Sequence, residues 1–192
     1  EIVRFLRSRG IHCTTLGACF AAAAGHLEVV EDLRTHGIHC DTSGVSFAAR
    51  NGHLEMIQYL RTYAIHGNSR SADHAASGGK LHVLIDLRAH GIHCSTAGAN
   101  QAAAAGHLDV LHDLFEHGIR CTFEGADLAA KFGRLEVIRF LRERDIRCSY
   151  HGADYAAQAR NNSLAIIHDL REHGIHCTHK GADLAALAGY LE

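Results

Sequence analysis

The chain has 192 residues, of which 47% are hydrophobic and 21% charged, with 18 histidines, 19 glycines, seven cysteines and no proline. This composition is typical of a folded globular chain and excludes a disordered or collagenous one. The 19 Lys and Arg against 21 Asp and Glu give a formal net charge of −2, which leaves no basic excess to attract nucleic acid or an anionic membrane surface. No run approaches the roughly 18 apolar residues that a membrane-spanning helix needs.

One phrase, Gly-Ile-(His or Arg)-Cys, recurs along the chain with small variations. Its seven copies begin at Gly10, Gly37, Ala64, Gly91, Gly118, Asp145 and Gly174. Successive copies are 27 residues apart, except for one step of 29. A fixed period between about 20 and 50 residues predicts an array of repeats, each packed on its neighbours. We place the two extra residues of the longer copy at 160–162, in a turn.

Each copy of the phrase is followed by a residue that can cap a helix N-terminus. These residues are Thr14, Asp41, Asn68, Ser95, Thr122, Ser149 and Thr178. We expect a first helix, called helix A, from each cap to a glycine such as Gly25, Gly52 or Gly106, because glycine favours the left-handed conformation at a helix end. A second helix, helix B, follows, as over 27–36, with apolar residues at helical spacing on one face. The sequence thus predicts a helix-turn-helix unit.

Helix A is built from unusually small residues. One slot holds Gly17, Gly44, Ser71, Gly98, Gly125, Gly152 and Gly181. An Ala-Ala pair follows in every copy, at 21/22, 48/49, 75/76, 102/103, 129/130, 156/157 and 185/186. Glycine inside a helix costs about 1 kcal/mol relative to alanine. Seven small residues in one slot therefore predict that adjacent repeats approach each other closely there.

Three segments carry a resemblance to a known family. Ala-Ala-Ala-Gly-His-Leu-Glu-Val-Val (22–30), Ala-Arg-Asn-Gly-His-Leu-Glu-Met-Ile (49–57) and Ala-Ala-Gly-His-Leu-Asp-Val-Leu (104–111) resemble the second half of an ankyrin repeat, and the likeness recurs over all 192 residues. The family's unit is usually about 33 residues long. This chain lacks the Thr-Pro-Leu-His signature and has only Gly-Ile-His-Cys where the longer β-hairpin finger would stand.

The resemblance implies an all-α fold, a right-handed α-solenoid of stacked helix-turn-helix repeats without β-hairpin fingers. We expect residues 1–192 to form a single array of about seven repeats. Glu1 and Glu192 fall in the same slot inside helix B. Because solenoids normally end in polar capping repeats, we expect the chain to be part of a longer array.

Six of the seven cysteines share one slot, and Cys19 is the exception. Residues one repeat apart are expected to be separated by the roughly 8–10 Å of packed helices. A disulfide needs Cα atoms within about 7 Å, so we expect no disulfides between cysteines of successive repeats. Free, buried thiols indicate a reducing compartment, so we expect an intracellular, cytoplasmic protein.

His-Cys clusters such as 36–40, 90–94 and 173–177 raise the alternative of a metal-binding repeat array. Each cluster offers three ligands, whereas a structural zinc site needs four. Arg120 and Arg147 occupy a ligand slot in two copies, which argues against a repeated metal site. The sequence contains no phosphate loop, nucleophile elbow or His-Glu-x-x-His motif. We therefore expect no enzyme activity, metal, cofactor or small-molecule substrate.

Slots that vary between repeats can read a partner, and three of them form one stripe on helix A, opposite the glycine and alanine face. In the first repeat they are positions 16, 19 and 23. The candidate residues in these rows are Arg50, Arg70, Asp73, Asn100, Glu124, Asp127, Lys131, His151, Asp154, Gln158, Lys180 and Asp183. Because first helices line the partner-binding groove of ankyrin proteins, the resemblance implies a non-enzymatic scaffold that binds a protein through this face.

A modular nucleic-acid reader is the remaining alternative, since each repeat of such a protein contacts one base. One slot of helix B carries Arg34, Arg61, Arg88, Arg142 and Arg171. Phe115 breaks that series, and Asp32, Asp86, Asp113 and Asp169 lie two residues before the slot. A basic stripe of the kind that neutralises phosphates is therefore absent from the sequence.

Overall fold

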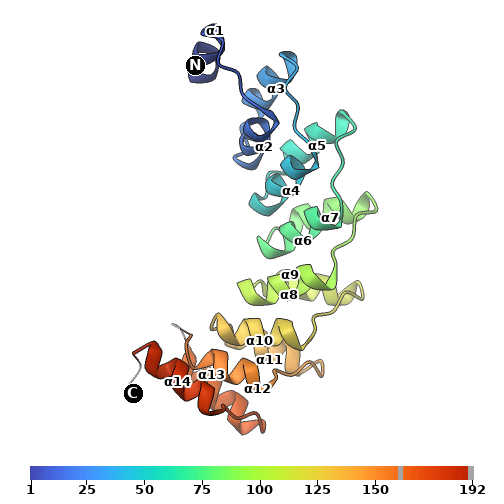
Figure 1. Cartoon of the computed structure of the whole chain (residues 1–192). Helices are drawn as coiled ribbons and strands as arrows, with labels where there is room; N and C mark the ends of the chain where they lie inside the picture. The colour runs from blue at the N-terminus through green and yellow to red at the C-terminus, as the bar shows by residue number, and fades with distance from the viewer. Residues whose placement is uncertain (160–161, 190–192) are drawn as a thin grey trace. The chain divides into compact units, whose positions relative to one another are not determined.

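The computed structural model describes residues 1–159 and 162–189, and over these ranges it contains fourteen α-helices and no strand. The chain divides into two compact units, Glu1–His93 and Cys94–Glu192. Each unit is a stack of helix-turn-helix repeats without β-hairpin fingers (Figure 1), which confirms the expected fold class. That the whole chain forms one array stays a prediction. Among the described helices, none has the length and apolar character needed to cross a membrane.

The helices follow the expected alternation. Unit 1 contains α1 (Ile2–Ser8), α2 (Thr15–Ala23), α3 (Leu27–Thr35), α4 (Thr42–Asn51), α5 (Leu54–Thr62), α6 (Ser69–Ser77) and α7 (Leu81–Ala89). Unit 2 contains α8 (Thr96–Ala105), α9 (Leu108–Glu116), α10 (Phe123–Lys131), α11 (Leu135–Arg142), α12 (Tyr150–Ala156), α13 (Ser163–Glu172) and α14 (His179–Leu187). The even-numbered helices of unit 1, and α8, α10, α12 and α14 of unit 2, are helices A. The others are helices B.

All seven predicted caps stand at the N-terminus of a helix A. Four of them use their own side chain for this. Asp41 accepts from the backbone N–H of Ser43, for example, and Asn68 forms a reciprocal capping box with Ser71. Capping satisfies backbone donors that the helix itself leaves without a partner. The helix starts were therefore legible in the sequence.

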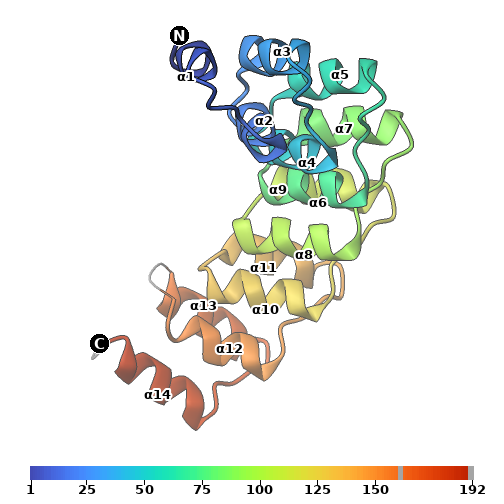
Figure 2. The same ribbon diagram turned by 45° about the horizontal axis from the view of Figure 1, so that its top comes forward.

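Helices A pack directly on one another within each unit. The contacts of α4 with α2 and α6, and of α10 with α8 and α12, are the most extensive between helices. Figure 2 shows α2, α4 and α6 following one another in unit 1, and α8, α10, α12 and α14 in unit 2. The alanine pairs fill this contact, since Ala48, Ala49, Ala102 and Ala103 are fully buried. Helices B contribute large apolar residues such as Leu87 to the same core.

The predicted close approach at the glycine slot is confirmed. A Cβ atom added at Gly125 would lie 2.6 Å from the Oδ1 of Asn100 in the preceding repeat, and one at Gly181 would lie 2.7 Å from the Oδ1 of Asp154. Real Cβ atoms essentially never approach heavy atoms within 3.0 Å. The helical cost of glycine is therefore offset by the contact that only glycine permits.

Glycine also ends the helices as predicted, because Gly25, Gly52 and Gly106 have φ of 75°, 87° and 93°. After helix B, the left-handed slot is held by Ala64 and Asp145 in two repeats, with φ of 60° and 61°. Asn162, at the turn with the two extra residues, has φ of 57°. Arg160, Asn161 and Glu192, which also entered the sequence predictions, lie outside the described residues.

Replacing Ala64 by glycine is expected to raise the free energy of unfolding by about 0.5–1 kcal/mol. A side chain in the left-handed region costs about 1–2 kcal/mol, part of which is cancelled by the extra freedom of glycine in the unfolded chain. Urea denaturation measures the difference. Ala89→Gly is the matched control, because Ala89 is an exposed residue of α7 outside the positive-φ set and should lose stability instead. A loss of stability in Ala64→Gly would contradict the strain.

Candidate functional site

Two of the three predicted rows on helix A lie at the surface. The first row, Leu16, Ser43, Arg70, Ala97, Glu124, His151 and Lys180, is exposed throughout. The third row contains the exposed Arg50 and Lys131 and the half-buried Gln158. These two rows together are called the helix A surface. Each unit presents its own part of it on helices that are held rigidly by packing.

The middle row does not have the predicted exposure. Asp127 and Asp154 are 7% and 1% exposed, so they lie inside the stack, and the expectation that they face a partner is wrong. Cys19 and Ser46 in the same row are also buried. Asp73 and Asn100 are half-buried, and Asp183 in the last helix is exposed. The three-and-four spacing of these positions and the polarity of their side chains could not distinguish a row in contact with solvent from a row of buried polar residues.

The buried members of the middle row bind the cap of the next helix A. Asp127 accepts hydrogen bonds from the backbone N–H of Ser149 at 2.7 Å and from its hydroxyl at 2.6 Å. Asp154 makes the same pair of contacts with Thr178, both at 2.7 Å. These two hydrogen bonds give the buried carboxylate oxygens partners and fix the start of the next helix A. We call these contacts the cap latches.

Other repeats form the same latch with different chemistry. Asn100 accepts from the backbone N–H of Thr122 at 3.0 Å and donates to its hydroxyl at 2.9 Å. The thiol of Cys19 lies 3.3 Å from the carboxylate of Asp41. Each latch crosses the glycine slot of the next helix. The latches are therefore the physical reason for the glycines that the sequence showed.

Burial raises the pKa of Asp127, because the loss of solvent around the carboxylate outweighs the hydrogen bonds from Ser149. Folding therefore shifts the protonation equilibrium of this carboxyl toward the neutral form, relative to the unfolded chain. This contribution to stability is present below the ordinary pKa of an aspartate and is lost as the pH rises through the raised value.

Replacing Asp127 by asparagine is therefore expected to raise the free energy of unfolding at pH 7, by less than about 1 kcal/mol. The amide keeps both hydrogen bonds, as Asn100 does, without the buried charge. Urea denaturation between pH 3 and pH 7 should show the gap between variant and wild type widening as the pH rises. A gap that is constant with pH would contradict this account.

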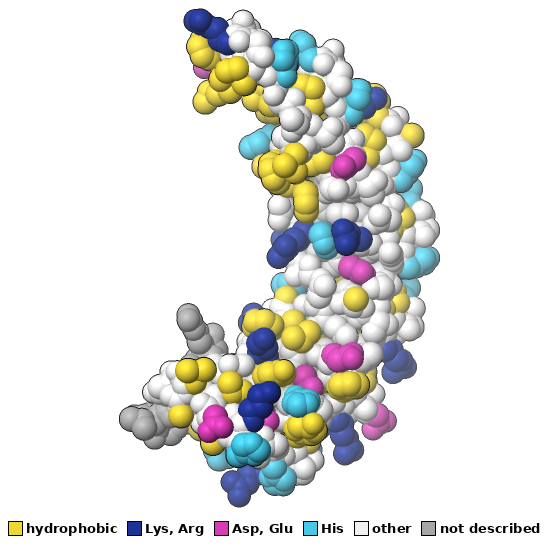
Figure 3. All heavy atoms as spheres, viewed as in Figure 1, with side chains coloured by type: hydrophobic (Ala, Val, Ile, Leu, Met, Phe, Trp, Pro, Cys, Tyr) yellow, Lys and Arg dark blue, Asp and Glu magenta, His cyan; other side chains and the backbone are white. Residues whose placement is uncertain are grey.

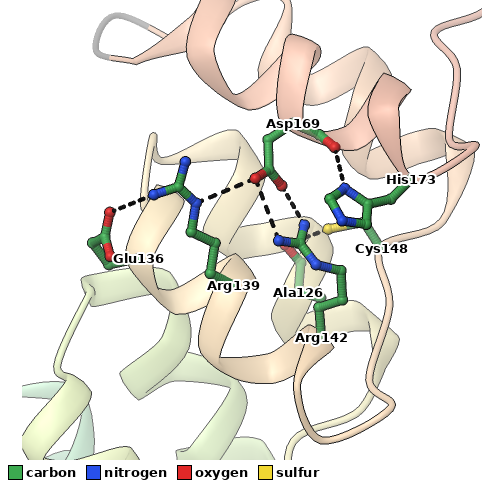
Figure 4. A network of polar contacts seen from close by, with 7 residues as sticks. All are labelled: Ala126, Glu136, Arg139, Arg142, Cys148, Asp169 and His173. Atoms are coloured by element: carbon green, nitrogen blue, oxygen red, sulfur yellow. Dashed lines mark hydrogen bonds and ion pairs between the residues drawn. The ribbon is translucent and has the colours of Figure 1, made fainter.

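Three arginines in the helix B slot pair with an aspartate of the next repeat. Arg7 contacts Asp32 at 2.8 Å, Arg61 forms an ion pair with Asp86, and Arg142 with Asp169. Figure 4 shows Asp169 between Arg142 and Arg139, whose Nε lies 3.2 Å from it. Asp32, Asp86 and Asp169 are thus the partners of the arginine one repeat earlier, whereas Arg34 stacks on Tyr63. Guanidiniums paired in this way do not contribute to the basic stripe that a nucleic-acid reader needs.

Histidines and cysteines of the clusters are directed to different partners. The Nδ1 atoms of His36 and His173 each donate to a backbone carbonyl of their own helix at 2.7 Å. The thiol of Cys177 donates to the carbonyl of Ala153 at 3.2 Å. Burial raises the pKa of Cys121 and Cys148 to about 12, which keeps the thiols neutral. Within residues 1–159 and 162–189, no three His, Cys, Asp or Glu side chains converge on a metal position.

Residues 18–61 match a family model described as ankyrin repeats in many copies. The solved ankyrin repeat domain of human ASB11 is similar to this chain, with 17% identity, a TM-score of 0.64, and coverage of 88% of this chain and 90% of that domain. No curated protein sequence matches. The chain therefore has the fold of an ankyrin repeat domain, and residues 18–61 match the ankyrin repeat family.

Proposed function

We propose that the protein is a non-enzymatic scaffold that binds a protein partner through the helix A surface. The observation that carries the proposal is that the first row is exposed throughout and the third is exposed at Arg50 and Lys131, while Asp127 and Asp154 of the middle row are held in the stack by the cap latches. A surface held by a rigid core loses little conformational entropy on binding, which favours affinity.

Aromatic residues beside the rows support a protein partner. Phe20, Phe123 and Tyr150 on helices A are 58%, 56% and 56% exposed. The Nζ atom of Lys131 lies 5.4 Å from the ring centre of Tyr155. Aromatic side chains next to charged ones are typical of the residues that contribute most to protein interfaces. On the face drawn in Figure 3, hydrophobic side chains likewise reach the surface in separate patches between charged ones.

The buried thiols support an intracellular compartment. None of the described cysteines forms a disulfide, and burial raises the pKa of Cys40 to about 12. Neutral thiols outside disulfides fit a reducing environment. We therefore place the scaffold in the cytoplasm, where a protein partner would be met.

A charge swap within the helix A surface tests the proposal. Glu124→Lys combined with Lys131→Glu keeps the net charge and is expected to lower the melting temperature by only a few degrees. Both residues are exposed, but the swap reverses the charges at the two ends of α10 and removes the hydrogen bond from Thr122 to Glu124. Affinity capture from cell extract, with quantitative mass spectrometry, should show partners of the wild-type protein reduced at least about tenfold, equivalent to about 1.4 kcal/mol.

The matched control is the exchange of Arg171 and Glu172, two exposed residues at the end of α13 on helix B. It also keeps the net charge and should retain the captured partners. Equal loss of the same partners in both variants would show that binding does not use the helix A surface. Retention in both would contradict the proposal for unit 2.

A further inference from the structure

Helices α9 and α11 contact each other through aromatic rings where other repeats use an ion pair. Phe115 occupies the arginine slot and Phe140 the aspartate slot of the next repeat. Their ring centres are 5.3 Å apart with an interplanar angle of 73°, and His112 packs edge-on against Phe140 at 4.5 Å. Phe140 is only 6% exposed. At this position the two phenylalanine rings stand in place of the ion pair. We call these rings the apolar floor.

Two arginine side chains lie over the rings of this floor. The guanidinium carbon of Arg144 lies 3.7 Å from the ring centre of Phe140, and that of Arg120 lies 5.6 Å from Phe115. Arg144 also donates through Nη1 to the carbonyl of Phe140 at 3.0 Å. A guanidinium stacked on a ring is partly desolvated and held in orientation, while its N–H edge remains able to bind an anion.

The arginines border an open hollow of about 230 Å³, lined by His112, Phe115, Glu116, Arg120 and Arg144. We call it the α9–α11 hollow. Two permanent positive charges face it against the single carboxylate of Glu116. Glu143 pairs with Arg144 at 3.5 Å but is 74% exposed, so a ligand carboxylate can replace it at little cost.

The sequence marks this repeat as different. The slot of Arg120 holds histidine in His12, His39, His66, His93 and His176, and the slot of Arg144 holds histidine or tyrosine in most copies. Arg120 followed by Arg144 is the one pair of successive copies with arginine in both slots. The arginine at position 120, which argues against a repeated metal site, therefore places a second permanent positive charge beside Arg144.

A related hollow in unit 1 provides a comparison. It measures about 390 Å³ and is lined by Glu31, Arg34, Thr35, Tyr59 and Tyr63. The guanidinium carbon of Arg34 lies 3.4 Å from the ring centre of Tyr63, and Glu31 supplies one carboxylate to this hollow for its one guanidinium. Both hollows therefore have aromatic rings in their lining. Of the two, only the α9–α11 hollow is lined by more arginines than carboxylates.

We propose that the α9–α11 hollow binds an acidic peptide segment of a protein partner, with a glutamate or aspartate side chain on Arg120 and Arg144. A guanidinium presents parallel N–H groups that match a carboxylate. An apolar residue next to the acidic one in the peptide covers the ring of Phe115, because the hollow is lined by apolar rings as well as charged groups. This site lies on helix B and is separate from the helix A surface.

The test uses two blocked peptides, acetyl-Leu-Glu-Phe-Glu-amide and its neutral counterpart acetyl-Leu-Gln-Phe-Gln-amide. NMR titration of the full ¹⁵N-labelled chain follows the Nε–H signals of the arginines. The glutamate peptide is expected to shift the signals of Arg120 and Arg144, with an affinity that falls as salt is added. The glutamine peptide is expected to leave them in place.

Arg120→Gln should weaken binding of the glutamate peptide at least about tenfold. Arg34→Gln, which removes the stacked arginine of the unit 1 hollow, is the matched control and should keep the affinity within about twofold. Arg120 is exposed, so an unchanged melt verifies that the variant is folded. Equal shifts with the glutamine peptide, or unchanged affinity in Arg120→Gln, would overturn the proposal whether or not the helix A surface binds a partner.

Discussion

Replacing Gly152 by alanine is expected to lower the free energy of unfolding by about 3 kcal/mol. A Cβ atom at this position would collide with the Oδ1 of Asp127 and lie 3.0 Å from the Cβ of Cys148. Overpacking of this kind costs about 1–3 kcal/mol, and displacement of a buried, hydrogen-bonded carboxylate adds a similar amount. The gain of about 1 kcal/mol in helix propensity offsets only part of this. Urea denaturation monitored by circular dichroism measures the result.

Gly17→Ala is the matched control, because Gly17 occupies the same slot of α2. An added Cβ would meet only Cys13, at an ordinary 3.4 Å, so this variant should gain up to about 1 kcal/mol. The natural pair of Ser46 and Ser71, whose hydroxyls are 2.9 Å apart, suggests a compensating change. Asp127→Ser with Gly152→Ser should therefore lose less than the sum of the two single changes. Similar effects of alanine at both glycines would contradict the latch.

Replacing Asp169 by alanine is the other change with a large expected effect, a loss of about 2–3 kcal/mol. The carboxylate is 8% exposed and receives hydrogen bonds from Arg142 and Arg139 (Figure 4). Its removal leaves two guanidiniums without their shared partner. Glu136→Ala serves as the control, since Glu136 is 70% exposed and pairs with Arg139 at 3.3 Å. It should change stability by less than about 0.5 kcal/mol.

The effect of Asp169→Ala should depend on pH. Burial opposes ionisation of Asp169, but the hydrogen bonds and charges of Arg142 and Arg139 together outweigh it and lower its pKa. The stabilisation is present above the ordinary aspartate pKa of about 3.9 and is lost as the pH falls through the lowered value. The difference between variant and wild type should therefore shrink in acid. A difference that grows in acid would show that the ion pairs do not stabilise the fold.

The repeat and its helices can be predicted from the sequence alone. The fixed period, the seven caps and the left-handed glycines depend on interactions between residues close together in the chain, and such interactions can be read from spacing alone. Thr14, for example, precedes a helix because its type and position suit a cap. The glycine slot even indicated close packing between repeats. The helix A candidates Arg70 and Glu124 are exposed, as their polarity suggested.

Which polar residues remain available to a partner depends on how the repeats pack in three dimensions. Asp127 and Glu124 are both acidic residues of one helix, yet Asp127 is buried because the cap of the next repeat lies opposite it. The pairing of Arg142 with Asp169, and the ring contact of Phe115 with Phe140, likewise join residues one repeat apart. Such partners depend on the stacking register of two helices, a property of three-dimensional packing that residue spacing in one chain does not specify.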